Sequence, residues 1–317
     1  MLKEIIDKVM ANQSVIDKIN IAGTHLNIGN DATYPDPFVK GKHHIIPIGD
    51  DCAAIPDGYG GYLLFAAEGI ISSFVETSPW FAGYSAVMVN ISDVCAMGGL
   101  PMAVTDVLWV QDDSQGQEIW AGMQAASAAY NVPIVGGHTC YRSEHKHLAV
   151  SILGKANNLL TSYDATPGET LMMAIDLNGN YYENYPFWNA STTAQPAHLQ
   201  AIIKLMYRLA EQGLSHAAKD ISMGGIVGTL AMLMHTSKIG VAINLDRVPK
   251  PAEAAWEKWL VSFPSFGYLF TCRPESQQDI QNLFASENIT CEAIGEIIKG
   301  STMAISYQDE KINIELN

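Results

Sequence analysis

The sequence lacks long apolar runs and any excess of basic residues. Its most apolar stretch, residues 79–105, is interrupted by Asn90, Ser92, Asp93 and a pair of glycines, so a buried helix of a globular protein is a better interpretation than a membrane span. Lysine and arginine number 18 against 33 aspartate and glutamate residues, a formal net charge of −15. A chain of this charge repels a phosphate backbone, which argues against nucleic acid as a partner.

The cysteines form no recognisable framework. They are few and scattered, with no C-x-x-C pair and no histidine at zinc-finger spacing; they are Cys52, Cys95, Cys140, Cys272 and Cys291. We interpret them as reduced thiols of a cytoplasmic protein. The opening segment MLKEIIDKVMANQ is charged and amphipathic, which predicts a helix over about residues 2–20 rather than a signal peptide.

The composition that is present indicates a folded protein of mixed structure. The 317 residues are 48% hydrophobic and 16% charged, which is typical of globular chains and long enough for two domains. Strand and helix patterns alternate along the chain, and the segment 155–169 has no periodicity. We therefore expect an α+β protein with two αβ domains, residues 1–155 and 156–317.

Local patterns predict the individual elements. In the first domain we expect strands at 44–48, 52–55, 62–67, 102–110, 132–135 and 148–153, with helices at 79–97 and 117–130. In the second we expect strands at 171–175 and 217–219 and helices at 197–212 and 223–235. The polar segment 27–42 is expected to be a long mobile loop, and the aromatic insertion 178–193 a surface loop.

Asp93 is the clearest chemical anomaly. It is the only formal charge between Glu76 and Asp106, on an otherwise apolar predicted helix. An unpaired buried carboxylate is costly, so a bound cation or a water-filled cleft is one good explanation. The alternative is that Asp93 lies at a rim or accepts backbone hydrogen bonds.

Two other acidic positions are candidates for cation ligands. Asp50 and Asp51 follow Gly49, so both carboxylates can converge from one turn on a hard cation such as Mg²⁺. Glu68 follows an apolar run and comes just before Gly69, which places a carboxylate at a strand end. For Asp50 and Asp51 a solvated turn remains the alternative, and for Glu68 an ordinary surface acid.

Two glycine-containing segments are candidates for contacts with a ligand. Gly136 and Gly137 follow a buried-strand pattern, which allows close backbone approach, and His138 comes next. Ser222 is the expected cap of a helix whose first amides are free to bind a phosphate. Ordinary helix capping and glycine packing explain the same patterns. The rings of the 178–193 insertion, such as Tyr182, suit an acceptor site, although packing against their own domain is the favoured alternative.

Taken together, the ordered segments GDDCAAI (49–55), LLFAAEGI (63–70), NISDVCAMGGLP (90–101), PIVGGHT (133–139), VSILG (150–154), PGETL (167–171) and KDISMGGI (219–226) resemble the aminoimidazole ribonucleotide synthetase superfamily. That superfamily includes thiamine-monophosphate kinase, selenophosphate synthetase and a hydrogenase maturation dehydratase. The resemblance extends over roughly residues 43–300.

The resemblance implies a fold and a set of ligands. It implies two αβ domains, with the N-terminal domains of a homodimer pairing their sheets into a β-barrel and ATP bound at the interface. By matching motif, the Mg²⁺ ligands are Asp50, Asp51, Glu68, Asp93 and Asp220. The implied nucleotide contacts are Asn90, Gly136, Gly137, Thr139 and Ser222, with Asp50 and His138 as catalytic candidates. The segment before Lys42 is expected to close over the phosphates.

The implied activity is phosphoryl transfer from ATP to an oxygen of a small-molecule acceptor. Three departures leave a catalytically silent nucleotide-binding regulatory or scaffold subunit as the alternative. Glu68 stands where relatives carry Asp, His138 where the kinase has Asp, and Met223 where the kinase has a further Asp. A metal-dependent hydrolase is a third interpretation, without a nucleophile or zinc motif to support it.

Overall fold

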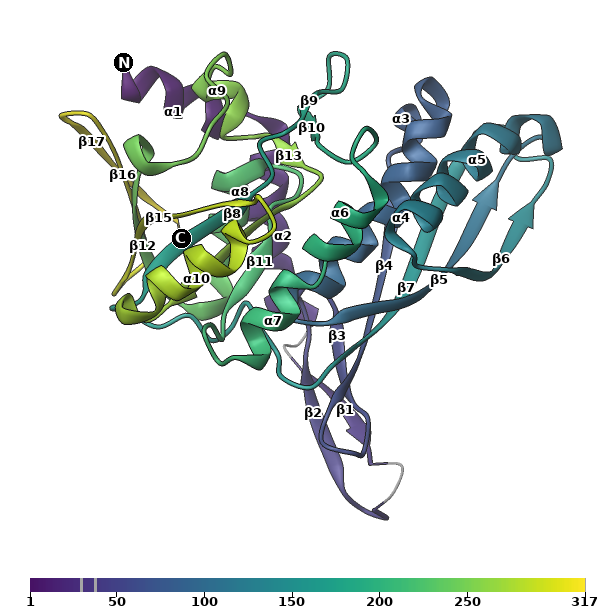
Figure 1. Ribbon diagram of the computed structural model, residues 1–317, viewed down its shortest axis with the longest axis horizontal. Coiled ribbons are helices and arrows are strands. Elements are labelled where there is room, and N and C mark those ends of the chain that lie inside the picture. Colours follow the sequence, from purple (N-terminus) through teal and green to yellow (C-terminus); the bar gives the residue numbers. More distant parts are fainter. Residues whose placement is uncertain (29–30, 37–38, 317) are drawn as a thin grey trace.

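The computed structural model describes residues 1–28, 31–36 and 39–316, and two large sheets organise them (Figure 1). The first has five strands in the order β3-β4-β7-β5-β6. Their bounds are Ala53–Pro56 (β3), Tyr62–Ile70 (β4), His147–Ala156 (β7), Leu100–Trp109 (β5) and Ile134–Cys140 (β6). Only β5 and β6 pair in parallel. Together with α-helices, this sheet gives the first half the mixed α and β content that we expected.

One face of the five-stranded sheet is covered and the other is open. Helix α4 (Pro79–Ala96) packs across the covered face, and α5 (Asp113–Tyr130) lies against α4. Alternate residues of β7, such as Leu148 and Val150, point into that core. On the opposite face Phe65 is 50% exposed and Leu153 is 36% exposed. The open face therefore carries apolar side chains that no layer from the described part of the chain covers.

The two long helices approach each other at glycines. A Cβ atom built on Gly122 of α5 would lie 1.9 Å from the carbonyl oxygen of Trp80, and one on Gly83 of α4 would lie 2.1 Å from that of Ile119. Any larger residue forces the helices apart. The position of α4 is thus set by backbone contact with α5.

The second sheet has seven strands in the order β11-β14-β8-β15-β12-β16-β17. Their bounds are Ala218–Asp220 (β11), Gly267–Cys272 (β14), Thr170–Ile175 (β8), Thr290–Ile298 (β15), Gly240–Asn244 (β12), Thr302–Tyr307 (β16) and Glu310–Glu315 (β17). Every residue of β8 is buried, because its two faces belong to different cores. Met172 and Ala174 join the core that contains α4, whereas Leu171 and Met173 join the core behind the sheet.

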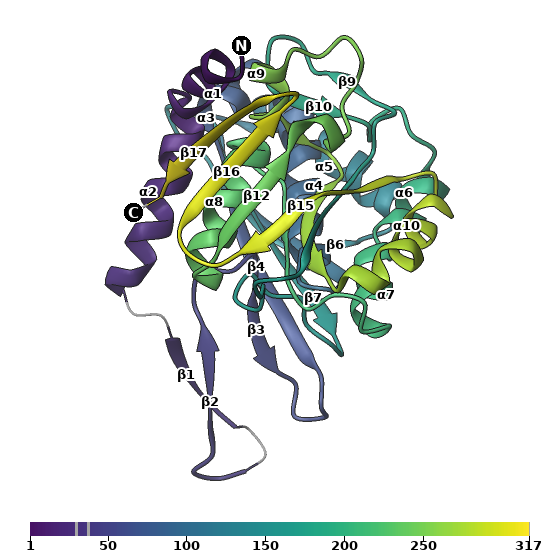
Figure 2. The ribbon, with the colours of Figure 1, turned by 90° about the vertical axis from the view of Figure 1, so that its left-hand side faces the viewer.

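Helices cover both faces of the seven-stranded sheet. Three of them, α6 (Pro196–Ile202), α7 (Leu205–Glu211) and α10 (Gln277–Ala285), contribute to the core shared with α4. On the other side lie α1 (Leu2–Met10), α2 (Gln13–Ile28), α8 (Gly225–Ser237) and α9 (Trp256–Trp259) (Figure 2). The division near residue 155 stays a prediction, and within the expected first domain α1 and α2 pack against the second sheet.

The remaining elements are small. Strands β1 (Asp31–Pro35) and β2 (His43–Pro47) form an antiparallel ribbon that extends away from the body (Figure 2). A three-stranded sheet, in the order β13-β10-β9, joins Phe263–Pro264, Phe187–Asn189 and Asn180–Tyr181. A short helix, α3 (Ser72–Thr77), precedes α4. Within the described part of the chain, no helix is both long and apolar enough to span a membrane.

Four expectations about the elements are wrong. The helix over residues 2–20 is two helices, because Asn12 Oδ1 accepts a hydrogen bond from the Ser14 amide and starts the second. The helix over 197–212 is also divided, into α6 and α7. Part of the expected mobile loop 27–42 is strand β1, and its residues 29–30 and 37–38 lie outside the described residues. The insertion 178–193 forms β9 and β10 rather than a surface loop.

The expected cap of α8 is wrong as well. The helix begins at Gly225 with Gly224 as its N-cap, so Ser222 lies before it. Gly224 has φ 90° and Gly225 has φ 61°, a region that residues with a Cβ rarely adopt. A Cβ on Gly225 would also lie 2.5 Å from the Leu260 carbonyl oxygen. The two glycines turn the chain, which leaves Ser222 two residues ahead of the helix cap.

Candidate functional site

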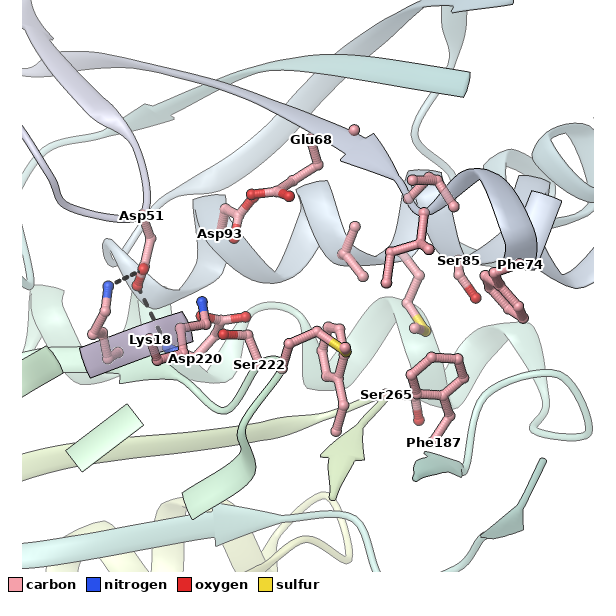
Figure 3. Close-up of a pocket in the computed structure, with 18 of the residues that line it drawn as sticks. Lys18, Asp51, Glu68, Phe74, Ser85, Asp93, Phe187, Asp220, Ser222 and Ser265 are labelled. Atoms are coloured by element: carbon pink, nitrogen blue, oxygen red, sulfur yellow. Dashed lines mark hydrogen bonds and ion pairs between the residues drawn. The ribbon is translucent and has the colours of Figure 1, made fainter. Parts of the chain in front are cut away.

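A cavity of about 360 Å³ lies between α4 and the strands of the second half (Figure 3). Its two ends differ in chemistry, as Figure 3 shows. We call one the acidic end; it carries five carboxyl groups and two lysines, namely Asp50, Asp51, Glu68, Asp93, Asp220, Lys18 and Lys219. We call the other the apolar end; it is lined by the rings of Phe74, Phe81, Phe187 and Phe263.

Helix α4 connects the two ends. Phe81, Ser85, Met88 and Asp93 all line the cavity, and their spacing places them along one face of a helix. At 1.5 Å per residue, Phe81 and Asp93 are about 18 Å apart along the axis. A single straight helix therefore fixes the separation between the apolar and the acidic side chains.

Asp50 and Asp51 are positioned by the turn at Gly49, whose φ is 107°. Both oxygens of Asp50 accept backbone hydrogen bonds, Oδ1 from the Asp51 amide at 3.0 Å and Oδ2 from the Ser162 amide at 2.8 Å. Asp51 instead faces the second half of the chain, where its Oδ2 accepts from the Asp220 amide at 3.4 Å. The turn thus brings both carboxylates into the cavity, as the sequence indicated.

Lys219 is the main site residue that sequence analysis missed. It is 3% exposed, and its Nζ makes an ion pair with Asp51 and lies 3.7 Å from Asp50 Oδ1. Burial works to lower the pKa of Lys219, but the charges of Asp51, Asp50 and Asp220 outweigh it and raise that pKa. The available signal was a lysine directly before Asp220 in a predicted buried strand.

Asp93 is buried without a full set of partners. Its side chain is 7% exposed, and Oδ2 has no hydrogen-bond partner in the described residues. Burial raises the pKa of Asp93 well above its usual value, and the charges of Asp220, Glu68 and Asp51 add to the effect. Figure 3 shows Asp93 and Glu68 facing each other across the acidic end. Burial also raises the pKa of Glu68.

Two further carboxyl groups have pKa values near neutrality. Burial, with the nearby charge of Asp51, raises the pKa of Asp50 to about 6, although Lys219 acts against the shift. Burial and Asp51 likewise raise the pKa of Asp220 to about 7, partly offset by Lys219 and Lys18. Two ammonium groups do not neutralise five carboxylates, so the acidic end is suited to additional positive charge.

The donor set fits a hard divalent cation that also contacts a phosphate. Carboxylate oxygens are the ligands that Mg²⁺ prefers, and the unpartnered Oδ2 of Asp93 is available. No three His, Cys, Asp or Glu side chains of the described residues lie close enough to hold an ion by themselves. Mg²⁺ in proteins is commonly bound by one or two carboxylates, with waters and substrate phosphates completing its shell. The carboxylates of the acidic end, which do not form a complete cage, agree with this mode of Mg²⁺ binding.

Several expected site residues lie elsewhere. Gly136, Gly137, His138 and Thr139 line a separate groove of about 690 Å³ beside α5, on the edge strand β6. Asn90 is fully buried and donates to the Ala86 carbonyl at 2.8 Å. Within one chain these five residues do not line the cavity, because β6 is at the sheet edge and Asn90 is on another face of α4.

The aromatic insertion does line the cavity. Phe187, Trp188 and Asn189 contribute to its wall, and Phe187 lies 5.2 Å from Phe74 of the first half, measured between ring centroids. The expectation that these rings pack only against their own domain is therefore wrong. Sequence analysis could not name the partners Phe74 and Phe263, because the contact with Phe74 depends on how the two halves meet and the contact with Phe263 on the pairing of β10 with β13.

Comparisons with known proteins place this geometry in a family. The profile of the AIR synthase related protein, N-terminal domain, matches residues 49–156, and that of the C-terminal domain matches residues 165–308. An uncharacterised protein of Synechocystis sp. is 47% identical over 271 residues, which cover 85% of this chain and 84% of the relative.

Two solved structures share the fold. Thermotoga maritima PurL complexed with ATP has a TM-score of 0.73 at 20% identity, over 84% of this chain and 45% of PurL, so the present chain spans about half of that protein. AaThiL complexed with AMPPCP and TMP has a TM-score of 0.65 at 20% identity, over 84% of this chain and 89% of AaThiL. At this level of identity the likeness establishes the fold.

Proposed function

The chain belongs to the AIR synthase related protein family, and from this premise we propose that it transfers the γ-phosphoryl group of ATP to an oxygen of a small molecule. One observation carries the proposal: a buried carboxyl oxygen of Asp93 has no partner among the described residues, at the end of a cavity that holds four more acids. ATP brings phosphates and Mg²⁺ to such a site together. The fold is shared with proteins whose structures hold ATP and AMPPCP.

The proposed metal ligands are Asp50, Asp51, Glu68, Asp93 and Asp220. Mg²⁺ would neutralise the charge that develops on the transferred phosphoryl group. In our proposal the Asp50 backbone hydrogen bonds hold the Gly49 turn in place. Lys219 pairs with Asp51, whose Oδ2 accepts from the Asp220 amide. These contacts orient the carboxylates before any ligand arrives, which lowers the cost of binding.

The proposed reaction is an in-line displacement. The acceptor oxygen forms a bond to the γ-phosphorus, the bond from that phosphorus to the β–γ bridging oxygen breaks, and its electron pair leaves with ADP. The acceptor proton passes to a carboxylate at the acidic end. Our candidate is Asp50, whose pKa burial raises to about 6 in the metal-free chain. It would take this role in place of ligating Mg²⁺, because a metal-bound carboxylate is a poor proton acceptor.

We propose a homodimer for the working enzyme. His138 and the glycines before it do not reach the acidic end within one chain, and the family resemblance implies nucleotide binding between two subunits. The open face of the five-stranded sheet carries apolar side chains such as Phe65, which suits pairing with a second copy. In that assembly His138 of one subunit would approach the nucleotide of the other.

The test is calorimetric titration of ATP with Mg²⁺ in excess and again with EDTA. We expect binding that requires Mg²⁺ and that falls at least tenfold in Asp93→Asn. Asp176→Asn is the control, since Asp176 is also buried, at 2% exposure against 7% for Asp93, but does not line the cavity. Unchanged MgATP affinity in Asp93→Asn contradicts the proposal. Binding without turnover of any acceptor favours the alternative, a regulatory or scaffold subunit.

A further inference from the structure

We infer that the acceptor is an aromatic alcohol whose ring portion carries no negative charge and binds at the apolar end of the cavity. The inference rests on the proposed function, because it assigns the acceptor of the same site. It concerns the half of the cavity that neither the acids nor the nucleotide would occupy.

The apolar end is built from rings that belong to four elements. Phe74 of α3 meets Phe187 of β10 edge-on, with centroids 5.2 Å apart and planes at 67°. Phe187 meets Phe263 of β13 at 6.2 Å and 88°, and Phe81 of α4 meets Phe74 at 5.9 Å and 90°. Phe74 and Phe81 are buried, whereas Phe187 and Phe263 are partly exposed, so an added ring can meet these two edge-to-face as the rings meet one another.

A second layer of rings holds the first in place. Tyr185 stacks on Phe187 with centroids 5.2 Å apart and planes at 2°, and Tyr182 stacks on Phe81 at 3.9 Å. Tyr185 is itself fixed by a 2.8 Å hydrogen bond to Thr77. The apolar end is thus formed before a ligand arrives, so little side-chain entropy is lost on binding.

Charge selects against an anion at this end. Both lysines of the cavity lie at the acidic end, and none of the other described lining residues is Lys, Arg or His. A carboxylate or phosphate placed among the four phenylalanines would be desolvated without a counterion. The ring portion of the acceptor is therefore free of negative charge.

The distances along α4 set the length of the acceptor. Ser85 and Asp93 are eight residues apart in the sequence, which is about 12 Å along the axis. A ring at the level of Ser85 needs a chain of several bonds to bring an oxygen near the acids. The Ser85 hydroxyl, which has no hydrogen bond within the described chain, lies beside that path and can bind a polar atom of the linker.

The experiment measures acceptor-side binding to the full chain without ATP. Saturation-transfer NMR would compare neutral phenylalkanols from phenylethanol to phenylhexanol, with hydroxybutylbenzoate as the anionic match of phenylbutanol. We expect phenylbutanol or phenylpentanol to bind best and hydroxybutylbenzoate at least tenfold more weakly. Phe187→Ala should weaken phenylbutanol binding at least fivefold, Phe187→Leu less, and Tyr59→Ala, which removes an exposed ring, not at all.

The outcomes separate this inference from the proposed function. Failure of every alcohol to bind, tighter binding of the benzoate, or unchanged affinity in Phe187→Ala overturns the inference, even if MgATP binds as proposed. Alcohol binding in a protein that does not bind MgATP supports the inference and overturns the proposed function. Melting temperatures of the two Phe187 variants establish that each is folded, and the leucine variant retains the test if the alanine variant is unstable.

Discussion

At the scale of single residues, Lys219 shows how a buried charge is held before a ligand binds. Its ammonium group joins Asp51 of the first half to a strand of the second. Both partners are almost fully buried, with side-chain exposures of 4% and 7%. Removing one partner of such a pair leaves an uncompensated charge, which is more destabilising than losing a surface ion pair.

We therefore predict that Lys219→Met lowers the free energy of unfolding by about 3 kcal/mol in metal-free buffer. The loss should be smaller with Mg²⁺ and ATP, because another cation then meets Asp51. Urea titrations in the two buffers measure both values. Lys155→Met is the control, since Lys155 forms a half-exposed pair with Asp57, and it should cost less than about 1 kcal/mol. Equal losses in the two lysine variants would contradict the prediction.

The raised pKa values also predict a pH dependence. Asp50 and Asp220 have folded-state pKa values of about 6 and about 7, above the values near 4 of an unfolded chain. Each therefore contributes stability that is fully present below its unfolded pKa and is lost as pH rises through its folded pKa. Lys219 titrates far above this range and does not alter the trend.

We expect the metal-free protein to melt at least about 3 °C lower at pH 8 than at pH 5, equivalent to about 2 kcal/mol. Calorimetric scans in EDTA across this range provide the measurement. Scans with Mg²⁺ and ATP are the control, and there the decrease should shrink. A melting temperature that rises with pH in EDTA would show that these carboxyl groups are already compensated.

Which site residues could be predicted depends on how local their signal is. Asp93 was identifiable because a lone charge in an apolar run is unusual whatever it contacts. Asp50 and Asp51 follow a glycine that marks a turn. Lys219 and Phe187 carry no such signal, since their roles arise only when the second half of the chain packs against α4.

At the scale of elements, the close contact of α4 with α5 determines where the cavity residues lie. Gly122 leaves no room for a Cβ beside the Trp80 backbone. Because α4 carries Phe81, Ser85 and Asp93 along one face, a displacement of this helix moves both ends of the cavity. A substitution on α5 thus acts on the cavity without touching it.

We predict that Gly122→Ala destabilises the protein by about 3 kcal/mol through overpacking and also weakens MgATP binding. Gly116→Ala on the same helix is the matched control. There the new Cβ would make ordinary contacts, with Leu108 at 3.4 Å and Val110 at 3.9 Å, so the gain in helix propensity should leave stability equal or up to about 1 kcal/mol higher. Thermal melts compare the two, and a neutral Gly122→Ala would contradict the close packing.

Elements with strong local patterns were predictable, and those with mixed patterns were not. The span of α4 was visible from Pro79 at its start and Gly98-Gly99 at its end. Strand β2 was predicted at 44–48, but β1 was hidden, because the Asn, Asp, Gly and Pro residues around it are typical of loops. Only pairing partners, such as Thr33 opposite Ile45, establish β1 as a strand.

At the scale of the whole molecule, the open face of the five-stranded sheet is the surface to which our proposal assigns the dimer. Phe65 and Leu153 are direct cross-strand neighbours on β4 and β7, and both are exposed. Adjacent exposed apolar residues on a sheet are typical of an interface. The dimer itself stays a prediction from the family resemblance.

We predict that the protein sediments at twice its chain mass and that Phe65→Lys shifts it to the monomer. Sedimentation velocity at several concentrations measures this. Tyr59→Lys, on an exposed turn outside the sheet, should leave the dimer intact. If the nucleotide site is shared between subunits, the monomeric variant also loses MgATP affinity. A wild-type protein that sediments as a monomer would contradict the proposed assembly.

The three-stranded sheet of β9, β10 and β13 has an evolutionary consequence. It pairs with neither large sheet, yet it supplies Phe187 and Phe263 to the cavity, while the carboxylates come from α4, β4, β11 and the Gly49 turn. In our proposal, two of the four rings that meet the acceptor are therefore carried by a small sheet that carries none of the carboxylates, whereas Phe81 and Asp93 share α4. Substitutions in the small sheet would then change which acceptor binds while the carboxylates stay unchanged.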